Sequence, residues 1–179
     1  MSPATILETD RLRLREWTKK DVRPYARHCN TLLVMRWLGD VQDDNELLED
    51  VDWFIDNQKR DGFTFWVMER KEDKAFLGFC GLIRVRDDDC PIHGELEIGW
   101  RVRADLWRKG YSYEAASQVL KFAFDVLRTM EVFSRVAPAN VASRGLMEKL
   151  GMRERRDLCH LPPGETEKLS VYAIAYSAC

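Results

Sequence analysis

Trp107-Arg108-Lys109-Gly110-Tyr111-Ser112-Tyr113-Glu114 is the stretch of this chain that decides its fold. Residues 95–102, which precede it, alternate polar with apolar side chains at period two, the pattern of a half-buried strand. Apolar residues at helical spacing follow it, so we expect a helix with one apolar face to begin near Ser112. The stretch is therefore predicted to turn a strand into a helix.

This turn has the features of an anion-binding loop. Gly110 lets the backbone come close to a ligand, and the first turn of the helix leaves N–H groups without internal partners. With the positive end of the helix dipole and the side chains of Arg108 and Lys109, these donors suit a phosphate or pyrophosphate. One glycine is weak evidence, because Walker and dinucleotide loops carry more. An ordinary tight connection is the alternative.

Length and composition are those of a globular protein with one domain, which we expect to span residues 1–179. The chain is 45% hydrophobic and 32% charged, with a formal net charge of -2. That charge provides no general basic field, so direct nucleic-acid binding is not expected. No apolar run approaches the roughly 20 residues that cross a bilayer, and no signal-peptide pattern opens the chain. We therefore expect a cytoplasmic protein that does not enter a membrane.

Cysteine and histidine usage argues against metal and disulfide sites. The five cysteines are odd in number, widely spaced and free of any Cys-x-x-Cys pair. None of the three histidines has a metal-ligand spacing. We expect no metal, and we interpret the thiols as structural.

The periodicities predict a single mixed α/β fold in the order strand, two helices, three strands, helix, strand, helix and two strands. Pro24 indicates that only the first turns of the first helix are regular. The helix over 44–59 should direct inward Leu47, Leu48, Val51, Phe54 and Ile55. The predicted strands cover residues 9–17, 63–69, 75–85, 95–102, 132–137, 152–160 and 168–176.

Three further stretches, with the turn and this order of elements, resemble a known family. They are Glu97-Ile98-Gly99-Trp100, Asn140-Val141-Ala142-Ser143 and Lys149-Leu150-Gly151-Met152. Over nearly its whole length the chain resembles the GNAT superfamily of acyl-CoA-dependent N-acetyltransferases. Its opening, Glu8-Thr9-Asp10-Arg11-Leu12-Arg13-Leu14-Arg15, resembles the RimJ/RimL branch.

The resemblance implies a mostly antiparallel seven-stranded sheet with about four flanking helices and a central parallel pair that splays apart. The pantetheine of acetyl-CoA, the implied cosubstrate, should lie between those two strands. Backbone groups of Trp100, Arg101 and Val102 should pair with it as a neighbouring strand would. Asn140 and Ser143 should contact the cofactor from the next strand and helix. The pyrophosphate should lie on the loop made by Trp107, Arg108, Lys109, Gly110, Tyr111 and Ser112.

The chain departs from the family pattern at the loop and at one catalytic position. Trp107 and Ser112 occupy the ends of the loop motif, and Arg108 stands where glycine is frequent. If that position needs a positive φ, Arg108 is strained. The tyrosine that many relatives use to protonate the leaving thiolate falls at Met147, so another acid is needed or the thiolate leaves without one.

Acetyl transfer by direct attack in a ternary complex needs a neutral amine and a stabilised carbonyl oxygen. Glu97 is the candidate base, directly or through a water, because it lies on the strand that lines the cleft. An ion-paired strand glutamate is the alternative. Ser143 is the candidate acid toward the thiolate, unless it only bonds the backbone at its helix start. A backbone N–H near Val102 is the expected oxyanion donor.

The acceptor amine is not determined by the sequence. The branch resemblance favours a protein N-terminal α-amine, such as that of a ribosomal protein, and a polyamine or aminoglycoside is the alternative. Trp37 is expected to line the acceptor pocket. Asp87, Asp88 and Asp89 would form a negative rim that favours cationic amines, unless they make only a solvated turn. A non-catalytic acyl-CoA-binding module, a cofactor-free RNA-associated protein and a homodimer also stay open.

Overall fold

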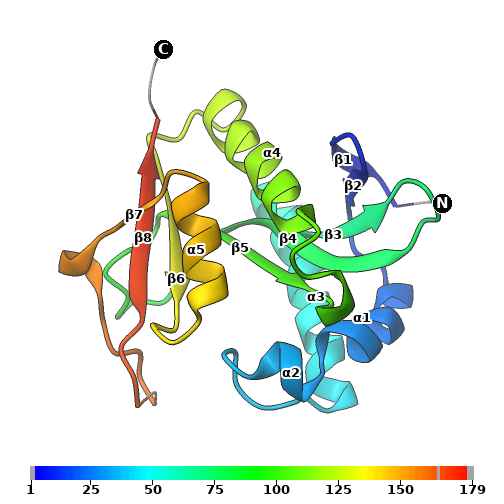
Figure 1. The fold of residues 1–179 in the computed structure, drawn as a ribbon, viewed down its shortest axis with the longest axis horizontal. Helices are drawn as coiled ribbons and strands as arrows, with labels where there is room; N and C mark the ends of the chain where they lie inside the picture. The colour runs from blue at the N-terminus through cyan, green and yellow to red at the C-terminus, as the bar shows by residue number, and fades with distance from the viewer. Residues whose placement is uncertain (1–2, 165, 177–179) are drawn as a thin grey trace.

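The computed structural model describes residues 3–164 and 166–176, which contain one mixed eight-stranded sheet (Figure 1). Its strands are Thr5–Glu8 (β1), Leu12–Arg15 (β2), Phe65–Arg70 (β3), Phe76–Arg84 (β4), Leu96–Val102 (β5), Glu131–Val136 (β6), Arg153–Glu154 (β7) and Ser170–Ala175 (β8). They lie in the order β1-β2-β3-β4-β5-β6-β8-β7. Neighbouring strands are antiparallel except β5 and β6, which are parallel.

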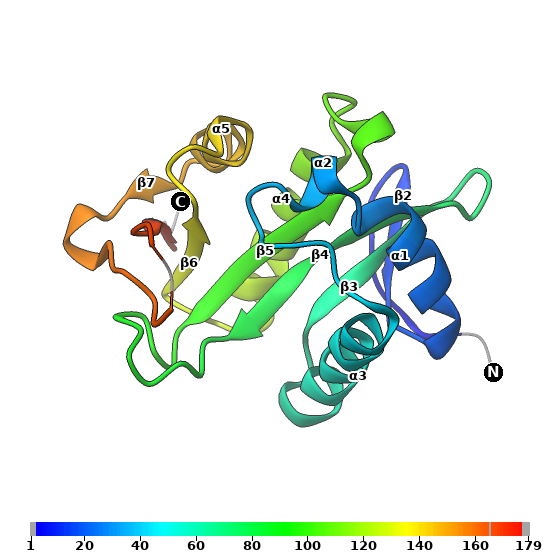
Figure 2. The same cartoon turned by 90° about the horizontal axis from the view of Figure 1, so that it is seen from below.

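Helices cover both faces of the sheet. In the described residues they are Val22–Cys29 (α1), Leu32–Met35 (α2), Asp44–Asp61 (α3), Tyr111–Asp125 (α4) and Val141–Lys149 (α5), with 3-10 turns at Lys19–Asp21 (η1), Ala104–Leu106 (η2) and Arg156–Leu158 (η3). α1 and α3 pack on one face of β3 to β5, and α4 packs on the other (Figure 1 and Figure 2). The predicted mixed α/β class with a central parallel pair is confirmed. None of the described helices is long and apolar enough to cross a membrane.

The alternation of β5 divides its side chains between two cores. Leu96, Ile98 and Val102 are buried on what we call the α4 face, in one cluster with the apolar stripe of α4. Glu97, Gly99 and Arg101 have the opposite parity and lie on the α1/α3 face. The second core there is strongly aromatic and includes Trp17, Tyr25, Phe54, Phe76 and Phe79. One strand therefore presents apolar side chains to α4 and its polar side chains to α1 and α3.

The helix predicted over 44–59 is α3, and its ends explain its bounds. The Asp43 carboxylate accepts from the N–H of Glu46, whose own carboxylate accepts from the N–H of Asp43, a capping box. Gly62 ends the helix with φ 79°. Leu48 was expected inward but is 40% exposed. Leu48 directly follows Leu47 and is rotated from it about the helix axis, so it lies at the edge of the buried stripe.

Three strand and helix predictions were wrong in extent. α1 continues past Pro24 to Cys29, because Pro24 lies in the first turn, where its missing N–H would have no partner. The single strand predicted over 9–17 is the second arm of a hairpin, because Thr9 turns the chain back by donating its N–H to Leu12. This hairpin adds the eighth strand.

The strand predicted over 152–160 is also shorter. Only Arg153–Glu154 pairs with β8 as a strand, and the η3 turn then breaks the ladder. The chain returns to pairing at one isolated bridge between His160 and Leu169. The turn expected at residues 162–164 follows that bridge, and the next residue lies outside the described residues.

Candidate active site

The parallel strands β5 and β6 separate soon after they meet. Their only register pair in the described residues is Glu97 with Phe133, and the Ser134 hydroxyl donates to the Ile98 carbonyl at 2.9 Å. Beyond Ile98, β5 has ladder pairs with β4 but none with β6. The half of β5 from Gly99 to Val102 therefore has one edge free of a neighbouring strand, and unpaired backbone groups on such an edge can bind an extended ligand.

The loop after β5 has the backbone geometry of an anion site. Arg108 and Gly110 both have positive φ, 63° and 83°, and Gly110 is the N-cap of α4. No backbone N–H from Arg108 to Tyr113 donates to another residue in the described ranges. These donors at a helix N-terminus suit a pyrophosphate. The sequence-based concern about Arg108 is confirmed, because a non-glycine residue at this φ is strained by about 1–2 kcal/mol.

Thr9 and Arg11 hold this loop in place through Glu114. The Glu114 carboxylate accepts from the Thr9 hydroxyl at 2.5 Å, and from the N–H and Nε of Arg11 at 2.9 and 2.6 Å. Arg11 also donates to the Lys109 carbonyl at 3.2 Å and lies 4.3 Å from the centre of the Tyr111 ring. Burial would raise the pKa of Glu114, but the bonds from Thr9 and Arg11 outweigh it and lower that pKa. The hairpin of β1 and β2 thus fixes the loop.

Glu97 lies where β5 and β6 part, and Arg135 on β6 holds it. Arg135 Nε lies 3.1 Å from both carboxylate oxygens, Nη2 lies 2.8 Å from Oε2, and the backbone N–H of Arg135 lies 3.0 Å from Oε1. Glu97 is 8% exposed. Burial would lower the pKa of Arg135, but the bonds to Glu97 raise it. The ion-paired alternative for Glu97 is therefore what the structure shows, and its role as base stays a prediction.

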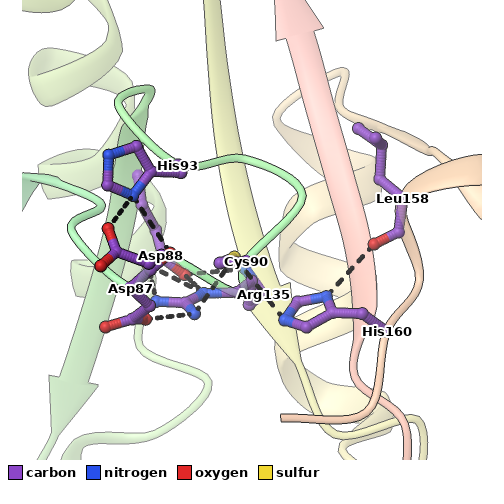
Figure 3. A network of polar contacts seen from close by, with 8 residues as sticks. Asp87, Asp88, Cys90, His93, Arg135, Leu158 and His160 are labelled. Atoms are coloured by element: carbon purple, nitrogen blue, oxygen red, sulfur yellow. Dashed lines mark hydrogen bonds and ion pairs between the residues drawn. The ribbon is translucent and has the colours of Figure 1, made fainter.

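The acidic loop before β5 joins the same cluster (Figure 3). Asp87 accepts from Arg135 Nη1 at 2.9 Å, while Asp88 lies 3.5 Å from His93 and is exposed, as is Asp89. Arg135 therefore links the loop to Glu97. It also offsets the charge of Asp87, so a negative rim would depend chiefly on Asp88 and Asp89.

The same view shows a thiol and an imidazole beside Arg135 (Figure 3). Cys90 Sγ lies 3.6 Å from both Arg135 Nη1 and His160 Nε2. Cys90 is buried in the small core formed by Val85, Ile92, Phe133, Val171 and Ala173. Arg135 already serves two carboxylates there, so this thiol adds packing and one weak hydrogen bond.

Asn140 and Ser143 open α5. Asn140 is its N-cap, and its side-chain oxygen accepts from the Ser143 N–H at 3.2 Å. Both residues are partly buried. Met147 is 2% exposed and packs in the core with α4, so it presents no acid. Cofactor contacts from Asn140 and Ser143 stay predictions.

Trp37 follows α2 and is 38% exposed. The Arg36 guanidinium lies 5.4 Å from the Trp37 ring and 5.7 Å from the Trp107 ring, which brings this segment against the start of the loop after β5. Trp107 itself is fixed, because its Nε1 donates to the Val102 carbonyl at 2.7 Å. That carbonyl is therefore already occupied, and Val102 can offer a ligand only its N–H.

Sequence reasoning missed the residues that hold Arg101. Its Nη1 donates to the Tyr25 hydroxyl at 2.6 Å, and that hydroxyl donates to Asp50 at 2.9 Å. Gln42 Nε2 donates to the same carboxylate oxygen at 3.1 Å. Burial raises the pKa of Tyr25, so the phenol stays protonated. No local sequence pattern indicates this hydrogen-bond network, because its residues come from four separate segments.

The match to the GNAT acetyltransferase domain covers residues 11–153. The chain belongs to the GNAT acetyltransferase family. It is 31% identical over 153 residues to the uncharacterised protein YkkB of Bacillus subtilis, covering 85% of this chain and 87% of that one. The family is therefore supported both by its domain pattern and by a relative that spans most of the chain.

Two solved structures share the fold of this GNAT protein. One is the spermidine N-acetyltransferase of Vibrio cholerae in complex with CoA and spermine, at TM-score 0.72 and 21% identity, covering 93% of this chain and 96% of that one. The other is RimL, a ribosomal L7/L12 alpha-N-protein acetyltransferase in complex with coenzyme A, at 0.78 and 14%, covering 96% and 98%. At these identities the likeness concerns the fold.

As a GNAT acetyltransferase, the protein moves an acetyl group from acetyl-CoA to an amine. Acetyl-CoA supplies the activated thioester. The residues present fit it, because β5 has an unpaired edge and the loop before α4 has unpaired N–H donors. Among residues 3–164 and 166–176 we find no group of three or more His, Cys, Asp or Glu side chains able to hold a metal ion.

Proposed function

We propose that this enzyme acetylates a primary amine by direct attack within a ternary complex, with the pyrophosphate of acetyl-CoA on the loop formed by residues 107–112. The observation that carries the proposal is the run of backbone N–H groups from Arg108 to Tyr113 that have no partner within residues 3–164 and 166–176, after a strand that has parted from its neighbour. The backbone groups of Trp100 and the N–H of Val102 line the thioester on that free edge, whereas the backbone groups of Arg101 face Phe79 in the ladder with β4.

Glu97 is the proposed general base. Its two oxygens accept four contacts from Arg135, which fills the lone-pair directions of a carboxylate. A proton reaches Glu97, directly or through a water, only when one of these donors moves. Arg135 has a second carboxylate partner in Asp87, so its guanidinium can shift without becoming unpaired.

Ser143 is the proposed acid toward the leaving thiolate. Its N–H is used by Asn140, and its hydroxyl has no hydrogen bond to another described residue. Met147, at the position of the family tyrosine, cannot donate a proton. Ser143→Ala should therefore lower kcat more than it raises the KM for acetyl-CoA.

The acceptor we propose is a protein N-terminal α-amine, in keeping with the RimJ/RimL resemblance of residues 8–15. A small polyamine or aminoglycoside is the second candidate. Its support is the exposed pair Asp88 and Asp89 beside the Glu97 cluster, which would attract a cation. A cytoplasmic location and a homodimer stay predictions.

The deciding experiment is a thiol-release assay with purified protein, acetyl-CoA and a panel of peptides, polyamines and aminoglycosides. Acetylation of any amine, verified by the mass of the product, supports the enzyme. Binding of acetyl-CoA by calorimetry without turnover of any amine would instead identify a non-catalytic module. Absence of binding at millimolar acetyl-CoA would remove both.

A further inference from the structure

Arg101 lies on β5 beyond the point where β6 parts from it, on the α1/α3 face. It is four residues from Glu97, which is about 13 Å along a strand. Gly99 lies between them on the same face, and a Cβ there would meet the Phe65 ring at 2.8 Å. No side chain of β5 therefore projects between Glu97 and Arg101 on this face, and the ring of half-buried Phe65 forms part of the surface there.

The guanidinium of Arg101 is held but not neutralised. Its only hydrogen bond in the described residues is from Nη1 to the Tyr25 hydroxyl, and no carboxylate lies within 4.0 Å of it there. The rings of Tyr25 and Phe79, at 5.6 and 5.3 Å, stabilise the cation without offering it a lone pair. Two other partly buried arginines of the sheet each contact two carboxylates: Arg15 pairs with Asp21 and Glu69, and Arg135 pairs with Glu97 and Asp87.

Two donors of the Arg101 guanidinium have no hydrogen-bond partner among the described residues. Nε is buried without a hydrogen-bond partner, and Nη2 is accessible to solvent and also makes none. A buried donor without an acceptor is costly, so native structures rarely keep one without a reason. Nε and Nη2 form the edge with which arginine binds a carboxylate in bidentate fashion, and of the two only Nη2 is open to solvent.

The support behind Arg101 is rigid. Asp50, which could have neutralised it, is kept one hydroxyl away by Tyr25 and also accepts from Gln42. Gln42 is fixed in turn by Asn30, whose side chain bonds both its carbonyl and its N–H at 2.8 and 2.9 Å. The network therefore orients Arg101 and leaves its charge for another partner.

We propose that Arg101 binds a carboxylate on the amine acceptor. This inference rests on the proposed function and names the acceptor class: amines that carry a carboxylate, either free amino acids or peptides with an acidic residue near the N-terminus. The charges along the α1/α3 face match an acceptor that has an amine at one end and a carboxylate at the other. Glu97 and Asp87 share the single cation of Arg135, which leaves a net negative charge at the end where an amine would be deprotonated, and the cation of Arg101, without an ion-pair partner among the described residues, lies at the other end.

The test compares matched acceptors. Initial rates of acetyl-CoA consumption are measured with L-amino acids against their α-amides, and with peptides Ala-Glu-Ala-amide against Ala-Gln-Ala-amide. Wild type should favour the carboxylate member of at least one pair by about tenfold or more in kcat/KM, as expected for a charge-assisted bond. An amide lowers the basicity of the adjacent amine, so its larger neutral fraction works against this preference. The pair that responds shows whether the carboxylate is that of an amino acid or of a side chain.

Variants assign the preference to Arg101. Arg101→Met should abolish it, and Arg101→Lys should keep part of it because the charge stays but the paired donors go. Arg27→Met is the matched control, since it removes an exposed cation on α1 that has no ion-pair partner among the described residues. Binding of acetyl-CoA by each variant, measured by calorimetry, verifies its folding.

The outcomes separate this inference from the proposed function. Turnover without any carboxylate preference, or a preference that survives in Arg101→Met, overturns the role of Arg101 while the acetyltransferase stands. If no amine turns over, the proposed function fails. The role of Arg101 as a carboxylate site is then tested by the binding of N-acetylated amino acids. A rise in melting temperature with the N-acetyl amino acid, absent with its amide and absent in Arg101→Met, supports the carboxylate site. No such rise overturns it.

Discussion

Arg135 of β6 donates hydrogen bonds to both carboxylate oxygens of Glu97 of β5, with Nε 3.1 Å from each and Nη2 2.8 Å from Oε2. This pair joins the two parallel strands at the point where they separate. A change in the opening between the two strands would therefore move this carboxylate. Any catalytic role of Glu97 therefore involves Arg135, a residue that the sequence did not single out.

Glu97→Gln should lower kcat at neutral pH by about 10²-fold or more, with little change in the affinity for acetyl-CoA, because a general base contributes on that order. The acidic limb of the wild-type pH–rate profile should disappear in the variant. An unchanged profile would show that Glu97 is only the structural partner of Arg135.

Arg135→Lys is the companion measurement. It keeps a cation near Glu97 but removes the paired donors, so a structural ion pair would lose stability in both variants to a similar extent. If Glu97 is the base, Arg135→Lys should retain far more activity than Glu97→Gln at equal melting temperature. Equal losses of kcat in the two variants would count against proton transfer to Glu97.

Gly110→Val should weaken the binding of acetyl-CoA at least tenfold, because φ 83° strains a branched residue and a side chain would block the approach of a phosphate. Gly62→Val is the matched control, since Gly62 has nearly the same backbone angles but lies at the end of α3. A Cβ at Gly62 would meet nothing within 4 Å, and one at Gly110 would meet only Arg11 Nη2, at 3.4 Å. Both variants should lose stability, and only Gly110→Val should lose binding. Calorimetry with acetyl-CoA that shows equal affinity for both would disprove the loop assignment.

How far the sequence predicted the site depends on how local each feature is. The turn from β5 into α4 was predicted because glycine, alternation and helical periodicity all lie within some thirty consecutive residues. The pairing of Glu97 with Arg135 was not, because it depends on the register of two parallel strands 38 positions apart in sequence. The contacts of Arg101 were not predicted for the same reason, because they depend on the packing of α1 and of the segment before α3 against β5.

Local reasoning also failed where tertiary contacts override a pattern. Pro24 is tolerated because of its place within the first turn, which only the actual start of α1 reveals. Residues 152–160 were predicted as one strand, yet the N–H of Arg155 makes the last bond to β8 before the η3 turn. The strand was therefore predicted in the right place and too long.

The acidic rim can be tested more sharply than by a single triple substitution, because Asp87 already pairs with Arg135. The double change of Asp88 and Asp89 to asparagine should raise the KM of a cationic acceptor at low salt, leave kcat unchanged, and lose its effect at high salt. Asp87→Asn should instead alter kcat, through Arg135 and Glu97. Kinetics with the best amine from the screen measure both. A double variant equal to wild type at both salt levels would leave this loop as a solvated turn.

Glu114 gives a prediction about pH. Its pKa is lowered in the folded state by the bonds from Thr9 and Arg11, which outweigh the effect of burial. A carboxyl group with a lowered folded pKa adds stability above its unfolded pKa of about 4.3, and loses that contribution as the pH falls through the folded pKa. Glu114→Gln should therefore reduce the free energy of unfolding by about 1–2 kcal/mol at pH 7, and the difference from wild type should shrink as the pH falls below the unfolded pKa and on through the lowered folded pKa.

The measurement for Glu114 is urea unfolding at a series of pH values, with Glu49→Gln as control. Glu49 is exposed on α3 and makes no hydrogen bond through its side chain to another described residue, so its replacement should change stability little at any pH. Glu114→Gln should also weaken acetyl-CoA binding at pH 7, because Arg11 would hold the Lys109 carbonyl less firmly and the loop would lose its preformed shape. A pH-independent loss of stability would show that Glu114 contributes by packing, and normal cofactor affinity would show that the loop keeps its shape without this tether.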